Sequence, residues 1–231
     1  LTCTGFAINR YTDIVVKLSQ TGSTGYNIIS RNQLPTRIDQ DFSQLYGNIF
    51  LNTASTDYIP VPDYGRMLII SHANYLSAMQ PFVDWKNSMG IQTEMVDIAT
   101  VGASSSAIKA FVEDYFNTNG LTFLLLVGDG PQVPTNTTGD LGGPSDVAYG
   151  YLLGNDHYPD LFVGRFSAEN VEHVQTMVQR TLEYEQAPLT TTNWFDKGVG
   201  IGSDQGPGDD GEMDYQHMQN IRTDLIGYTF A

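Results

Sequence analysis

Acidic residues are the main candidates for metal binding or catalysis in this sequence. In the loop GNDHYPD (154–160), Asp156, Tyr158 and Asp160 alternate, so a short turning segment directs two carboxylates and a backbone carbonyl toward one point. Hard cations such as Ca²⁺ bind oxygen sets of this kind. Asp129, which follows the apolar run FLLLV, is a candidate ligand from an adjacent strand. The pattern predicts a calcium site, and the alternative is an acidic loop that is simply solvated.

Two further carboxylates lie in the C-terminal part of the chain. Asp204 ends the segment KGVGIGSD (197–204) and precedes a stretch rich in Gly and Pro. A carboxylate in such a position orients a catalytic imidazole in many hydrolases, and the alternative is that it caps a backbone turn. Asp214 lies near the start of a predicted helix. It either complements the helix dipole or pairs bidentately with a guanidinium at the base of a pocket.

A nucleophile with a neighbouring base is missing from the sequence. Cys3 is the single cysteine, and no histidine is close to it in the chain. The histidines are scattered, with His72 at a predicted strand end, His157 between the predicted calcium ligands, and His173 and His217 within predicted helices. The motifs GxGxxG, GxxxxGK[ST], HExxH and GxSxG are also absent. The residues of this chain therefore do not form a complete hydrolytic constellation.

Strands and helices alternate from Arg66 onward, and this order predicts how the carboxylates are positioned. The predicted strands are RMLIISH (66–72), QTEMVDI (92–98), FLLLVGD (123–129), one on each side of the polar loop within 148–167, and KGVGIGSD (197–204). The predicted helices cover 73–90, 104–120 with a cap at Ser104 to Ser106, 167–186 and 211–227. The alternation predicts an α/β fold with a mostly parallel sheet flanked by helices.

The carboxyl ends of parallel strands are where ligands gather in such sheets. We therefore expect Gly128-Asp129, the loop from Asp156 to Asp160, and Ser203-Asp204 to cluster at that edge.

The first 62 residues have a different character. TDIVVKL (12–18) and YGNIFLNT (46–53) have the β-branched and aromatic content of strands, and no helix of normal length is evident. The sequence predicts a β-rich N-terminal segment over 1–62, followed by an α/β unit over 63–231.

Composition excludes several classes of function. Against 26 Asp and Glu stand 11 Lys and Arg, for a net charge of -15. A chain of this charge repels nucleic acids and anionic membrane surfaces. No apolar run reaches the roughly 18 residues of a membrane helix, and no signal peptide is evident. Because the chain opens without Met, we interpret it as a piece of a longer protein.

Several motifs together resemble one family. They are YGRMLIISHANYLSAMQPFVDWKNSMGIQTEMV, LLLVGD, SDVAYG, GNDHYPDLFVGRFS, TLEYE and GSDQGPGDDGEMDYQH. In order and approximate spacing they are similar to the gingipains, secreted bacterial cysteine peptidases with a caspase-like fold. The resemblance implies that Asp204 orients the catalytic histidine and that Asp214 receives the P1 side chain of arginine-directed members. It also implies a structural calcium site formed by Asp129, Gly154, Asp156, the carbonyl of Tyr158, and Asp160.

The resemblance also implies what lies outside this chain. The family's catalytic histidine and cysteine lie on later strands, so they belong to the remainder of the catalytic domain, downstream or as a second chain. Residues 1 to about 57 match the end of a pro-segment. Asp57 occupies the position where arginine-directed members have the basic residue that is cleaved, so cleavage before Tyr58 is not expected. Arg31 and Arg37 are alternative cut sites or pocket-blocking residues.

The resulting hypothesis is the N-terminal part of a secreted gingipain-like cysteine endopeptidase zymogen that cuts protein substrates after Arg, outside the bacterial cell or at its surface. Two alternatives remain open. One is a catalytically inactive, calcium-stabilised binding or scaffold domain, and the other is a specialised peptidase that processes envelope proteins.

Overall fold

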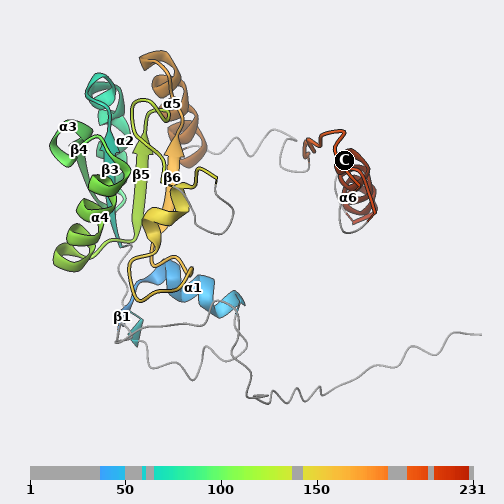
Figure 1. The fold of residues 1–231 in the computed structure, drawn as a ribbon, viewed down its shortest axis with the longest axis horizontal. Helices are drawn as coiled ribbons and strands as arrows, with labels where there is room; N and C mark the ends of the chain where they lie inside the picture. Colours follow the sequence, from blue (N-terminus) through green and yellow to red (C-terminus); the bar gives the residue numbers. More distant parts are fainter. Residues whose placement is uncertain are drawn as a thin grey trace, which may run out of the picture.

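A four-stranded parallel sheet organises the described part of the protein (Figure 1). The computed structural model describes residues 37–49, 59–60, 65–136, 143–186, 197–207 and 211–228. The strands follow the order β4-β3-β5-β6, with bounds Arg66–Ser71 (β3), Gln92–Asp97 (β4), Phe123–Val127 (β5) and Phe162–Phe166 (β6). All neighbouring pairs are parallel. The predicted α/β class is confirmed.

Helices cover both faces of this sheet. One face packs against η2 (Ala73–Tyr75), α2 (Leu76–Ser88) and α5 (Val171–Gln186). The other face packs against α3 (Ile98–Val101), α4 (Ser105–Asn119) and η3 (Asp146–Gly150). The core therefore consists of two apolar layers, one on each side of the central strands.

The central strands β3 and β5 supply side chains to both layers. In β3, Leu68 and Ile70 face the layer under α4, whereas Met67 and Ile69 face the layer under α2 and α5. All four side chains are buried. Strands covered on both faces have continuous apolar sequences, which is why RMLIIS and FLLLV lack polar alternation.

A helix replaces part of the strand that the sequence predicted over 46–53. Helix α1 spans Gln40–Ile49, and Asp39 caps it by accepting the N–H of Phe42 at 2.9 Å through Oδ1. Apolar residues recur at helical spacing in this segment: Phe42, Leu45, Tyr46 and Ile49. That period of about 3.6 residues outweighs the aromatic and β-branched content on which the strand was predicted.

Two short strands flank α1. Strand β1 (Arg37–Ile38) pairs in parallel with β2 (Ile59–Pro60). Arg37, predicted to lie in an exposed loop, is therefore in a paired strand. The predicted strand over 12–18, as well as Arg31, Asp57 and Tyr58, lies outside the described residues.

Two other predicted strands are also absent from the places expected. Residues 146–150 form the turns of η3 instead of a strand before the polar loop. Residues 197–204 form no strand, and Val199 and Ile201 are 90% and 88% exposed. Glycine occupies three of these eight positions, and glycine weakens a strand that lacks a packed neighbour. The helix predicted after this segment is present as α6 (Asp214–Tyr228).

Within the described ranges, none of the helices combines the length and the apolar character required to cross a membrane.

Candidate active site

Main-chain hydrogen bonds join the strand ends at the carboxyl edge of the sheet. The N–H of His72, directly after β3, donates to the last carbonyl of β5 at 3.2 Å. The N–H of Gly128, directly after β5, donates to the last carbonyl of β6 at 3.0 Å. The N–H of Asp129 donates to the carbonyl of Ala168 at 3.0 Å. These bonds connect the turns that follow β3, β5 and β6 into one hydrogen-bonded edge, which we call the platform.

Asp129 is part of this platform, as the sequence predicted. Its carbonyl accepts the N–H groups of Gln132 and Val133, both at 2.9 Å. Its carboxylate Oδ1 accepts the hydroxyl of Ser167 at 3.1 Å. Asp129 thereby connects the turn after β5 to the turn after β6.

Arg165, which the sequence interpretation missed, binds the same turns from within β6. Its Nε and Nη2 donate to the two carboxylate oxygens of Asp146 at 2.6 and 2.7 Å. Its Nη1 donates to the carbonyls of Gly128 and Val133 at 2.7 and 2.8 Å. The Arg165 and Asp146 side chains are 11% and 23% exposed. The sequence did contain a signal for this role, because Arg165 is a charged residue inside the otherwise apolar segment FVGRF. A guanidinium buried in such a strand requires hydrogen-bonding partners.

Tyr149 fixes the segment that carries Asp146. Its ring is fully buried, and its hydroxyl donates to the carbonyl of Pro134 at 2.7 Å. Burial, followed by the negative charge of Asp146, raises the pKa of Tyr149 to about 12. The hydroxyl therefore stays protonated and donates its hydrogen bond throughout the neutral pH range.

The loop from Asp156 to Asp160 lies at the opposite edge from Asp129. Phe162, two residues after Asp160, pairs with the first residue of β5, whereas Asp129 follows the last residue of β5. The end of the loop and Asp129 are therefore separated by the length of β5. Its five residues span about 16 Å at roughly 3.3 Å per residue. The expectation that this loop joins the carboxyl edge is wrong, because the loop leads into β6 and does not follow a strand.

Both carboxylates of the loop organise its backbone. Oδ2 of Asp160 accepts the N–H groups of Leu152 and Leu153 at 2.9 and 2.7 Å. Asp156 is only 5% exposed, and its Oδ1 accepts the N–H of Tyr158 at 3.1 Å. Across the described ranges, no group of three or more His, Cys, Asp or Glu side chains is arranged to hold a metal.

The loop's oxygen atoms nevertheless have the chemistry that a hard cation prefers. They comprise the two carboxylates and the backbone carbonyls of Gly154 and Tyr158. Asp129 does not fit this set, because it lies at the other edge of the sheet.

A lysine ammonium already lies beside this loop. Nζ of Lys109, on α4, donates to the carbonyls of Ala148, Tyr149 and Tyr151. Burial lowers the pKa of Lys109, and the negative charges of Glu113 and Asp160 oppose that shift. The backbone that leads into the loop is thus held by an internal cation.

Asp204 and Asp214 belong to one local unit. The hydroxyl of Ser203 donates to Oδ2 of Asp214 at 2.5 Å. The N–H of Asp214 donates to the carbonyl of Gln205, and the N–H of Tyr215 to the carbonyl of Ser203, both at 3.0 Å. Asp204 therefore lies between two residues that bind the first turn of α6.

Gly202 permits this close approach. A Cβ atom at Gly202 would lie 2.8 Å from the carbonyl oxygen of Asp214 and 2.9 Å from Cα of Tyr215. Any larger residue would separate the loop from the helix. The side chains of Asp204 and Asp214 are both exposed to solvent, so a substrate can reach them.

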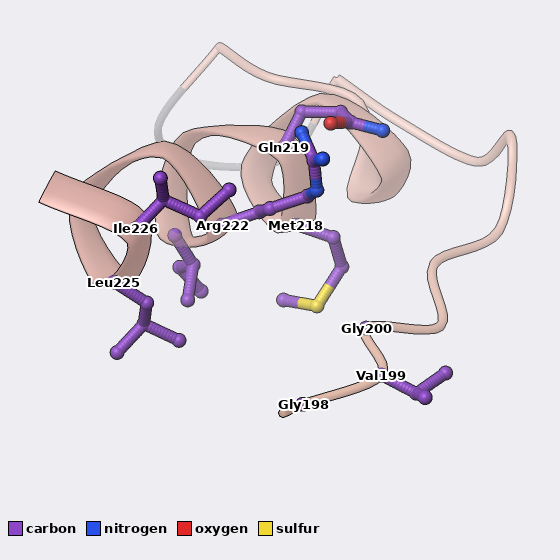
Figure 2. Close-up of a pocket in the computed structure, with 9 residues that line it drawn as sticks. Gly198, Val199, Gly200, Met218, Gln219, Arg222, Leu225 and Ile226 are labelled. Atoms are coloured by element: carbon purple, nitrogen blue, oxygen red, sulfur yellow. The ribbon is translucent and has the colours of Figure 1, made fainter. Parts of the chain in front are cut away.

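An apolar groove lies under α6, about 290 Å³ in volume (Figure 2). It is formed by the segment Gly198–Gly200 and by α6 side chains that include Met218, Leu225 and Ile226. Asp214 does not line this groove. The groove is therefore distinct from the P1 pocket expected around Asp214.

The described residues contain no thiol that could act as nucleophile, because Cys3 lies outside them. Nδ1 of His72 accepts the N–H of Asn74 at 3.3 Å, and Nδ1 of His217 lies 3.2 Å from the carboxylate of Glu212. These histidines have local structural roles. Among the described residues, the candidate site consists of carboxylates with their backbone and hydroxyl partners, and it includes no thiol.

Comparison with protein families matches residues 61–229 to the family described as Peptidase family C25. Among curated proteins, gingipain R2 of Porphyromonas gingivalis is 39% identical over 95% of this chain, and Lys-gingipain of the same species is 28% identical over 68%. The chain spans 31% of the length of the first relative and 10% of the second.

Solved structures give the same result. The Arg-specific cysteine proteinase gingipain R superposes with a TM-score of 0.62 at 37% identity, over 72% of this chain and 40% of that one. A complex of the pro- and mature domains of RgpB from Porphyromonas gingivalis matches with the same values. The sheet flanked by helices is the part of this chain that carries the family fold.

Proposed function

The chain belongs to peptidase family C25, and on that premise we propose that it is the N-terminal part of a gingipain-like cysteine endopeptidase that cuts proteins after arginine. The observation that carries the proposal is the unit in which the exposed carboxylate of Asp214 is bound by Ser203, next to Asp204. The preference for arginine is supported by gingipain R, a relative described as Arg-specific, which is similar over 72% of this chain.

Each carboxylate of this unit has a defined role in the proposal. Asp214 pairs with the P1 guanidinium, whose planar fork matches a carboxylate in a way that a lysine ammonium does not. The hydroxyl of Ser203 restricts the rotation of that carboxylate by donating to Oδ2. Asp204 accepts the imidazole N–H of the catalytic histidine and so fixes its tautomer.

The reacting groups come from the remainder of the catalytic domain. A cysteine thiolate attacks the carbonyl carbon of the peptide bond, and the imidazolium gives its proton to the departing amine. Water, deprotonated by the same imidazole, then attacks the acyl carbon, the carbon–sulfur bond breaks to release the carboxylic acid product, and the thiolate and imidazolium are restored. The proposal includes secretion from the bacterial cell and protein substrates. Its support is the similarity to bacterial gingipains over 95% of the chain.

Peptide-library cleavage by the complete enzyme tests this function. We expect cleavage after Arg, with Lys and neutral P1 residues slower by about two orders of magnitude or more, since only Arg pairs bidentately. A thiol-alkylating reagent is expected to abolish the activity. Absence of hydrolysis by a properly folded complete protein would instead favour the binding or scaffold function. Cleavage confined to a few envelope proteins would favour the specialised peptidase.

We also propose a structural calcium ion in the loop 154–160, held by the carboxylates of Asp156 and Asp160 and the carbonyls of Gly154 and Tyr158. At 10 mM Ca²⁺ the melting temperature is expected to rise by about 3 to 10 °C, because a ligand that binds only the folded state stabilises it. Thermal melts with Ca²⁺, with Mg²⁺ and with chelator measure this effect.

Two variants make the calcium test specific. Asp156→Asn is expected to remove most of the response. Asp129→Asn is the matched control and keeps the response, because Asp129 lies at the opposite edge of the sheet. An unchanged melting temperature in the wild-type protein, or an equal loss in both variants, would refute a site in this loop.

A further inference from the structure

A lysine ammonium fills a cluster of main-chain carbonyls beside the loop 154–160. Nζ of Lys109 donates to the carbonyls of Ala148, Tyr149 and Tyr151 at 3.1, 3.4 and 2.5 Å. An ammonium has three N–H donors and no acceptor, and oxygen atoms that converge on one point are also what a hard metal cation binds. Lys109 therefore acts in this cluster as a cation that is tethered to α4.

The loop binds the same stretch of backbone. The carbonyl of Gly150 accepts the N–H of Asp160 at 2.8 Å. The N–H of Leu152, which belongs to the same peptide group as the carbonyl of Tyr151, donates to Oδ2 of Asp160 at 2.9 Å. The bond lengths of that one peptide group limit the distance between Lys109 Nζ and Asp160 Oδ2 to about 8 Å. The ammonium is thus close to a carboxylate of the proposed calcium site.

The short distance places each charged group in the electric field of the other. Salt at physiological concentration screens charges over about 8 Å, so their interaction is only partly screened. Burial lowers the pKa of Lys109, and the negative charges of Glu113 and Asp160 oppose that shift. The Asp160 carboxylate thus helps to keep the ammonium charged. A divalent ion on Asp160 would compete with Lys109 for this carboxylate and would be repelled by the ammonium.

The loop is also held by contacts that do not involve Lys109. Oδ1 of Asp156 accepts the N–H of Tyr158 at 3.1 Å. The ring of His157 stacks on the ring of Tyr151, with centroids 5.3 Å apart and an interplanar angle of 24°. Since these contacts remain when the ammonium is removed, the loop keeps its oxygen atoms in place. The charge of Lys109 then decides whether its removal strengthens or weakens calcium binding.

We infer that Lys109 is a tethered cation that partly replaces calcium at the loop 154–160. It holds the backbone beside the loop when calcium is absent, and it weakens the binding of calcium when the ion is present. The inference rests on the calcium site proposed above and names the residue that sets the affinity of that site. Removal of the ammonium is therefore expected to make the fold less stable without calcium and more responsive to it.

Thermal melts over a calcium titration test this inference, with the complete protein alkylated at its active-site thiol to prevent autolysis. Without calcium, Lys109→Met is expected to lower the melting temperature by about 3 to 8 °C, since three carbonyls lose their donor. Its Kd for calcium is expected to be about 3- to 10-fold lower than that of the wild type, since the repulsion is gone. Adding Asp156→Asn to Lys109→Met is expected to remove the response, which would assign it to the loop.

Matched variants separate the charge of Lys109 from other effects of mutation. Lys197→Met makes the same chemical change at an exposed residue and is expected to leave the melting temperature and the Kd unchanged. Lys109→Arg keeps the charge, with a Kd expected within about 2-fold of the wild-type value. Lys109→Gln keeps an N–H donor but loses the charge, so it gives the same calcium readout even if Lys109→Met does not fold.

The outcomes distinguish this inference from the calcium site itself. A calcium response in Lys109→Met but not in the wild type would refute calcium binding by the natural protein and support the tethered cation. Equal Kd values in the two proteins would overturn the inference and leave the calcium site standing. Weaker binding by Lys109→Met, or no response in either protein, would overturn the inference as well.

Discussion

Asp214→Ala in the complete enzyme is expected to lower kcat/KM for arginyl substrates by about 100- to 1,000-fold. Truncating one partner of a desolvated charge pair costs about 2 to 5 kcal/mol, and here the bound guanidinium would lose its carboxylate. Substrates with a neutral P1 residue do not use that carboxylate, so their kcat/KM changes little. Steady-state kinetics with matched Arg and neutral substrates give the ratio directly.

Two further variants sharpen this prediction. Asp224→Ala removes an exposed carboxylate from the same helix and is expected to leave the ratio unchanged. Ser203→Ala keeps the Asp214 carboxylate but removes the hydroxyl that donates to it, for an expected loss of about 10-fold. If Asp214→Ala retains the wild-type preference for Arg, Asp214 is not the P1 partner.

Arg165→Met is expected to lower the free energy of unfolding by about 3 to 5 kcal/mol. The guanidinium makes four hydrogen bonds, two to Asp146 and two to the carbonyls of Gly128 and Val133. Its removal leaves the Asp146 carboxylate largely buried without its cation, which is the costly outcome for a buried pair. Natural domains have only about 5 to 15 kcal/mol of stability, so urea denaturation will detect this loss.

The control for Arg165 is another arginine in a regular element. Arg180→Met makes the same chemical change on the exposed side of α5 and is expected to alter stability by less than about 0.5 kcal/mol. Adding Asp146→Asn to Arg165→Met is expected to cost less than the sum of the two single changes, because the stranded charge is gone. Additive losses would mean that the two side chains do not act as a pair.

The sequence predicted secondary structure best where a single local feature, such as a continuous apolar run or a helix N-cap, was strong. The continuous apolar run at β5 and the N-cap of α4 are both present in the structure, with Ser104 Oγ accepting the N–H of Ala107 at 3.2 Å. Local composition was misleading where tertiary contacts decide. The segment 46–49 is helical because its apolar residues follow a helical period, because Asp39 caps the helix, and because Phe42 packs on Phe162; the last of these contacts is not evident from the sequence alone.

Within the candidate site, the spacing of residues along the sequence indicated which residues lie in the same loop more reliably than it indicated where that loop lies in the fold. Asp204 and Asp214 lie in one unit, an arrangement that came from the family resemblance, since ten residues of loop and helix start do not fix it. Asp156 and Asp160 lie in one loop as predicted, but at the other edge of the sheet from Asp129. That error followed from the strand predicted before the polar loop within 148–167, because a loop that follows a parallel strand lies at the carboxyl edge, whereas this loop follows η3 and leads into β6.

The positions of the arginines bear on self-digestion, a hazard for any peptidase directed to that residue. Each arginine among the described residues lies within a helix or a strand: Arg37, Arg66 and Arg165 in strands, Arg180 and Arg222 in helices. A protease accepts a substrate as an extended chain with free backbone groups, so a bond within these elements becomes cleavable only after local opening. Autolysis at these five positions would therefore require local opening of the fold and would increase with the population of the open state.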